Sequence, residues 1–118
     1  MSIKWKFCIL CDDLWMEFED NDEIIGDKET LTSWLTDDVR DYAPTLEFID
    51  KALSGELEDN LFWGNGFKAY IGQEDTEIHF NFEEEDPSIK PCKLPTKLLR
   101  EIVAVWLEEF EKYRNSKK

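Results

Sequence analysis

The chain has 118 residues, of which 42% are apolar and 14% aromatic, and its formal net charge is −14. This length fits one compact domain over residues 1–118, and the aromatic content excludes an acidic disordered tail. The excess of 28 acidic over 14 basic residues argues against nucleic-acid binding, which needs clustered Lys and Arg. We therefore expect a folded domain that attracts basic partners; a generic acidic surface is the alternative.

No apolar stretch approaches the roughly 20 residues that a membrane-spanning helix needs. The first residues also lack the apolar run and the small-residue cleavage site of a signal peptide. These two features predict a cytoplasmic protein that has no membrane partner.

Cys8, Cys11 and Cys92 are an odd set of cysteines, so we expect free, buried thiols and no disulfide framework. The alternative is a zinc site, because Cys8 and Cys11 have C-x-x-C spacing and His79 could complete it with Cys92. However, Cys8 lies in a strand-like run, and no glycine supports a metal-binding turn. We therefore expect no metal.

Residues 3–19 predict a β-hairpin, because apolar and polar side chains alternate there in two runs. Asp12 and Asp13 separate the runs and predict a tight acidic turn. The acidic segment at 20–28 that follows is expected to be an exposed loop.

Residues 29–54 show helical spacing in two pieces, with apolar side chains at offsets of three and four. Pro44 separates the pieces and predicts that a new helix begins near it, because proline is tolerated in a first turn but breaks a helix interior. Gly55 predicts the end of that helix. For residues 29–36 the pattern leaves a helix and a short strand open.

Residues 61–63 and 67–71 predict two strands joined by Gly64-Asn65-Gly66, since Asn-Gly favours hairpin turns with positive φ. A third strand is predicted at 76–82, where polar and apolar residues alternate. His79 falls on the polar face of this strand and is expected to be solvated.

The predicted strands are followed by a loop and a final helix. Four consecutive carboxylates at 83–86 and three prolines up to Pro95 predict the loop. An amphipathic helix is predicted from Thr96, its N-cap, to Tyr113, with basic residues at 114–118 that suit the negative end of the helix dipole. The predicted fold is α+β: a single domain with an antiparallel β-sheet packed by helices and a C-terminal amphipathic helix.

No catalytic constellation is recognisable in the sequence. The only histidine, His79, is accompanied by no nucleophile elbow and no activated-cysteine signature. The Gly64-x-Gly66 pair lacks the third glycine and the following helix of a dinucleotide motif. We therefore expect no enzymatic activity and no cofactor. A small enzyme with a carboxylate site stays open as an alternative, because 28 acids make some carboxylate pairs inevitable.

Four motifs lie between residues 46 and 113: Leu53-Ser54-Gly55-Glu56, Phe62-Trp63-Gly64-Asn65 before a strand, Thr76-x-Ile78 before an acidic stretch, and Leu94-Pro95-Thr96 opening a Trp-containing helix. Together they resemble small bacterial immunity proteins, which include proteins that protect against contact-dependent growth inhibition and related polymorphic toxins. The resemblance implies a non-enzymatic protein that binds and blocks a cognate toxin C-terminal domain. Residues 1–45 carry no part of the pattern.

Charge and resemblance together indicate which residues contact the partner. Many such toxins are nucleases with basic clefts, so exposed carboxylates are the expected contacts. We also expect Trp63 in the core and Asn65 in a structural role in its turn. The predicted primary contact loop is Glu83, Glu84, Glu85 and Asp86, and the predicted second patch is Asp20, Asp22 and Glu23.

Two alternatives accompany this prediction. Each acidic segment could be an ordinary solvated loop. The protein could also be an acidic regulatory or scaffold protein that binds a different basic partner, because the charge argument is the same for any basic protein.

Overall fold

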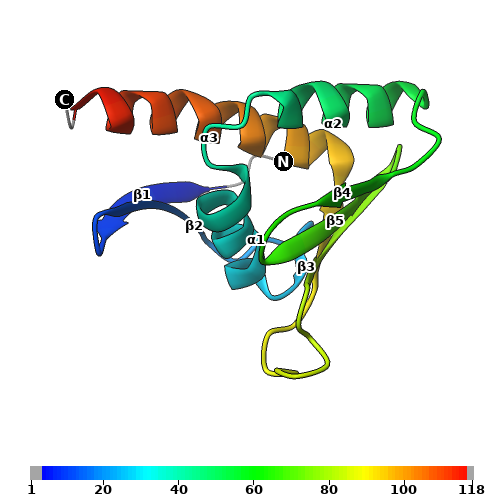
Figure 1. Cartoon of the computed structure of the whole chain (residues 1–118), viewed down its shortest axis with the longest axis horizontal. Helices are drawn as coiled ribbons and strands as arrows, with labels where there is room; N and C mark the ends of the chain where they lie inside the picture. Colours follow the sequence, from blue (N-terminus) through cyan, green and yellow to red (C-terminus); the bar gives the residue numbers. More distant parts are fainter. Residues whose placement is uncertain (1–3, 117–118) are drawn as a thin grey trace.

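The structure is a computed structural model that describes residues 4–116. It contains a five-stranded antiparallel sheet with the order β3-β7-β6-β5-β4, which lies to the right of α1 in Figure 1. A second sheet is a two-stranded hairpin. The strands are β1 (Trp5–Leu10), β2 (Asp13–Phe18), β3 (Ile25–Gly26), β4 (Leu61–Trp63), β5 (Phe67–Ile71), β6 (Asp75–Phe80) and β7 (Cys92–Pro95). The helices are α1 (Lys28–Trp34), the π-helical turn η1 (Leu35–Val39), α2 (Pro44–Ser54) and α3 (Thr96–Ser116). The predicted α+β fold is therefore confirmed.

The β1–β2 hairpin confirms the first prediction and shifts its turn by one residue. Leu10 pairs with Asp13, so Cys11 and Asp12 form a two-residue turn. Their φ angles are 53° and 63°, the left-handed backbone that a tight, twisted hairpin requires. Residue 3 of the predicted strand lies outside the described residues.

The central segment is helical, which settles the open choice for its first part. Asp27 caps α1 by accepting the backbone N–H of Glu29 at 2.9 Å. The chain continues into η1, which ends at Arg40 with φ 45°. A new helix, α2, begins at Pro44 and ends before Gly55, whose φ is 77°, as predicted.

Two short strands lie where the sequence predicted loops, so the loop predictions are wrong at these positions. β3 falls in the acidic segment 20–28, and β7 falls among the prolines. Cys92 and Leu94 of β7 point into the core and are buried. Four residues offer only two inward positions, so the alternation is too short to separate β7 from a loop by pattern alone.

Helix α3 extends three residues beyond the predicted end at Tyr113, and residues 117 and 118 of the predicted basic end lie outside the described range. Thr96 does not act as the predicted N-cap. Its hydroxyl donates to the Gly72 carbonyl at 2.7 Å and lies 2.8 Å from the Thr76 hydroxyl, so it joins the helix start to β6. Within residues 4–116, no helix combines the length and the apolar character needed to cross a membrane.

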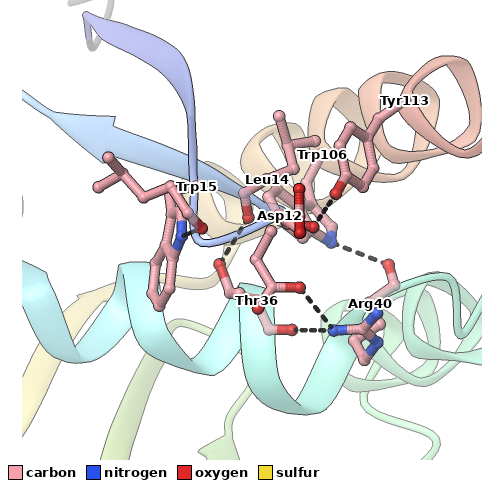
Figure 2. Close-up of polar contacts among 9 residues, drawn as sticks. Asp12, Leu14, Trp15, Thr36, Arg40, Trp106 and Tyr113 are labelled. Carbon is pink, nitrogen blue, oxygen red and sulfur yellow. Dashed lines mark hydrogen bonds and ion pairs between the residues drawn. The ribbon is translucent and has the colours of Figure 1, made fainter. Parts of the chain in front are cut away.

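Figure 2 shows how the hairpin is attached to the helices. The Thr36 hydroxyl donates to the Leu14 carbonyl at 2.9 Å, and the Trp106 indole N–H of α3 donates to the Arg40 carbonyl at 2.9 Å (Figure 2). The Arg40 guanidinium donates a hydrogen bond to the Thr36 carbonyl at 3.1 Å. These bonds connect β2, η1 and α3 on the inner side of the five-stranded sheet.

Candidate protein-binding surface

The predicted primary contact loop extends away from the body of the molecule, as the yellow segment between β6 and β7 in Figure 1. Glu84, Glu85 and Asp86 are exposed. Glu83 is half-buried, and its carboxylate lies 3.2 Å from His79 Nδ1 of β6, the strand that leads into the loop. Three of the four predicted carboxylates therefore point into solvent, and the fourth is tied to the sheet.

The prediction that His79 is solvated is wrong, because its side chain is only 21% exposed. Its two ring nitrogens lie 3.2 Å from Glu83 and 3.5 Å from Glu77, and its ring packs edge-on against Tyr70 with 5.7 Å between centroids. Glu77 precedes His79 by two residues on β6 and Glu83 follows it by four, so local sequence places both glutamates, whereas the pairing of β5 with β6 brings in Tyr70.

The second predicted patch lies in the loop between β2 and β3. Asp20 is neutralised by Lys28 at 2.5 Å, and this hydrogen bond lowers the pKa of Asp20. Asp22 is exposed, and Glu23 is half-buried with its backbone N–H donating to Asn21 at 2.7 Å. The patch thus offers less free negative charge than its sequence suggests.

The structure does not join the two acidic segments into one site. Strands β3 and β7 are antiparallel, so the loops that lead into them enter at opposite ends of the pairing. Among residues 4–116, no hydrogen bond or ion pair connects residues 20–23 with residues 83–86.

Within residues 4–116, no helix covers the outer face of the five-stranded sheet. Side chains alternate along each strand, and the outward set includes exposed large apolar residues: Trp63 is 66% exposed, Ile25 63% and Tyr70 44%. This outer face also carries the polar residues Lys68, Glu77, His79 and Lys93.

The predicted core role of Trp63 is therefore wrong. Its neighbour Phe62 takes the inward position, opposite Ala69, and its ring meets the buried Trp34 edge-on with 6.4 Å between centroids. In a strand of three residues, two adjacent aromatics must face opposite ways, and hydrophobicity alone does not say which faces inward.

The β4–β5 turn is held by Asp38 of η1. Its carboxylate accepts the backbone N–H groups of Asn65 and Gly66 at 3.0 Å each and that of Phe67 at 2.8 Å. Neither Asn65 nor Gly66 has a positive φ, so the predicted Asn-Gly turn conformation is wrong. The hairpin itself forms as predicted, and Asn65 is structural through its backbone.

A groove of about 620 Å³ lies between the β1–β2 hairpin and α1. Trp15 and Leu10 give it apolar walls, and Glu17 and Glu29 supply negative charge. Lys28 also lines it, so the ion pair with Asp20 stands at its edge. No local pattern predicts this groove, because its two walls come from separate segments of the chain, residues 10–18 and 26–33.

The three cysteines have different environments. Cys92 is buried, and burial followed by the nearby Asp27 carboxylate raises its pKa to about 12. Cys8 is half-buried and donates to Glu17 at 3.0 Å, which raises its pKa, whereas Cys11 is exposed in the turn. The prediction of buried thiols holds for Cys92 and is wrong for Cys11. The described part of the chain places no three His, Cys, Asp or Glu residues so that they could hold a metal ion.

Comparison of the chain with protein-family models, with curated proteins and with solved structures finds no match. The surface of the chain and its sequence motifs are therefore the features that point to a function. That surface has three parts: the projecting acidic loop, the uncovered sheet face and the groove beside the hairpin.

Proposed function

We propose that this chain is an immunity-type protein that binds a basic toxin domain, of the nuclease class, and neutralises it. The observation that carries the proposal is the projecting loop with the exposed carboxylates of Glu84, Glu85 and Asp86, on a chain with a net charge of −14. The resemblance of residues 46–113 to immunity proteins names the class of partner.

A basic cleft is complementary to this loop because a nuclease must attract the phosphates of its substrate. Complementary potentials raise association rates well above those of neutral pairs, and salt screens them over a Debye length of about 8 Å at physiological ionic strength. The chain would therefore reach the toxin quickly and compete with the anionic substrate for the same basic groups.

Co-expression tests the proposal. We expect the chain to form a complex with the C-terminal domain encoded immediately upstream and to restore growth of cells that produce this domain. Failure to form the complex, or a complex without rescue of growth, would contradict the immunity function. A complex without toxicity or rescue is the result expected of a scaffold protein.

Association kinetics with the same purified domain test the role of the loop. We expect the triple variant Glu84→Gln, Glu85→Gln and Asp86→Asn to associate about tenfold more slowly at low salt and to lose most of the salt dependence. The matched control removes three carboxylates from exposed positions of α3, with Glu101→Gln, Glu108→Gln and Glu111→Gln. Equal slowing of association in both variants would mean that the loop acts only through the net charge of the chain and has no special role.

A further inference from the structure

We propose that the basic partner packs against the outer face of the five-stranded sheet. Trp63 and Tyr70 of this chain anchor the interface, and the acidic loops of this chain form its rim. This inference rests on the proposed function and adds the place of contact to it. Trp and Tyr are among the residues most enriched at positions that dominate binding energy, and both are exposed here on a face that no helix of the described chain covers.

The strand register brings the anchors together. Leu61 lies opposite Tyr70, and Trp63 lies opposite Lys68 on the same pair of strands. Trp63 and Tyr70 are therefore diagonal neighbours on one face, within reach of each other's large side chains. Across the next strand pairs, Tyr70 lies opposite Glu77, and the apolar surface recurs at Ile25 on the edge strand.

The hairpin that carries Trp63 is fixed before any partner binds. Asp38 holds the three backbone N–H groups of the turn that follows, and the Asn81 amide donates to the Gly64 carbonyl at 3.1 Å. An exposed Trp on a fixed backbone loses little conformational freedom on binding. The arrangement is that of a preformed anchor rather than of a mobile surface residue.

Carboxylates flank this face at both ends of its strands. The Asn60 amide donates to the Ile71 carbonyl at 2.6 Å, which brings the loop before β4 to one end of β5, beside the β5–β6 turn. The backbone N–H of Asn81 donates to the Gly66 carbonyl at 2.8 Å, so the predicted primary contact loop begins at the other end. The exposed acids are Glu56, Glu58, Asp59, Glu74 and Asp75 at the first end and Glu84, Glu85 and Asp86 at the second.

Exposed aromatic side chains on β4 and β5 with acidic loops at both ends fit one kind of occupant, an apolar patch flanked by Lys and Arg on a basic protein. Among the described residues of this face, Lys68 and Lys93 carry the full positive charges. A nucleic acid would be repelled by the acidic rim. A second copy of this chain would bring another net charge of −14 to the same rim, so self-association is disfavoured.

The two parts of the surface should affect different rate constants. Rim carboxylates act at a distance and set the association rate and its salt dependence, while buried aromatic anchors set the dissociation rate. Against the upstream-encoded toxin domain, we expect Trp63→Ala and Tyr70→Ala each to speed dissociation at least tenfold and to change association by less than about threefold.

Tyr42→Ala is the matched control, because Tyr42 is 54% exposed but packs beside Phe62 on the inner side of the sheet. We expect it to dissociate like the wild type. Thermal unfolding of all three variants checks that the fold is retained. Wild-type dissociation rates in Trp63→Ala and Tyr70→Ala would overturn this inference alone. Absence of wild-type binding to the domain would overturn the proposed function and this inference together.

Discussion

At the scale of single residues, the carboxylate of Asp38 stabilises a hairpin turn that in other hairpins is formed by residues with positive φ angles. Its three bonds to backbone N–H groups hold a turn in which neither Asn65 nor Gly66 adopts left-handed backbone. Hydrogen bonds to a charged acceptor each contribute about 1.5–3 kcal/mol. Asp38 comes from η1, far along the chain, so this turn is stabilised by tertiary contact and not by its own sequence.

The two glycines of the turn should respond differently to substitution. A Cβ at Gly64 would lie 2.3 Å from Asp38 Oδ2 and 2.9 Å from Asp38 Cβ, whereas a Cβ at Gly66 would meet no atom within 4 Å. We expect Gly64→Ala to lower the free energy of unfolding by about 1–3 kcal/mol, and Gly66→Ala to leave it unchanged or raise it by up to about 1 kcal/mol. Urea denaturation measures both. Equal effects would contradict the role assigned to Asp38.

At the scale of elements, β7 is the least recognisable strand and one of the most important. It lies between β3 and β6, and its two inward residues are buried in the core. One of them, Cys92, has a pKa of about 12 in the folded protein because burial and then Asp27 disfavour the thiolate. A thiol in the unfolded chain ionises at about pH 9.

This difference predicts how stability depends on pH. Between about pH 9 and pH 12 the unfolded chain releases the Cys92 proton while the folded chain keeps it, so the free energy of unfolding falls as pH rises. The slope contributed by one thiol approaches about 1.4 kcal/mol per pH unit. Urea denaturation of the wild type and of Cys92→Ala at about pH 8, 9 and 10 isolates the contribution of this thiol to the free energy of unfolding. We expect their stabilities to converge above pH 9, and curves that stay parallel would contradict the prediction.

At the scale of the whole molecule, the net charge of −14 acts on stability as well as on binding. The Debye length is about 30 Å at 10 mM salt and about 8 Å at 150 mM. The radius of gyration is 13.8 Å, so charges across the entire protein repel one another at low salt but only near neighbours do at physiological salt. Repulsion in the compact state is therefore relieved by salt.

We expect the melting temperature to rise by about 2–5 °C when sodium chloride increases from about 10 mM to about 150 mM, because relief of repulsion by about 0.5–1 kcal/mol shifts it by this amount. The loop variant Glu84→Gln, Glu85→Gln and Asp86→Asn carries less negative charge and should show a smaller rise. Calorimetry measures both. A melting temperature that falls with salt would indicate that attractive ion pairs, such as Arg100 with Asp50, outweigh the repulsion.

Much of the fold could be predicted because it depends on local pattern. Alternation specified β1, β2 and β6, and Pro44 and Gly55 marked both ends of α2. The exposure of Glu84 to Asp86 followed from a run of charges that no core could accommodate. The two-residue strand β3 and the four-residue strand β7 could not be predicted, because they are too short to show an alternating pattern. They are strands because β3 pairs with β7 and β7 pairs with β6.

The sequence by itself determined the composition, the charge, the order of the longer elements and the position of the acidic loop, because each depends on residues close together in the chain. Only the tertiary structure decided that Phe62 faces inward and Trp63 outward, that Asp38 fixes their hairpin and that the Tyr70 ring packs against His79. The physical reason is the same in each case. Side chains from strands and helices distant in sequence define which face is buried, and no local pattern contains that information.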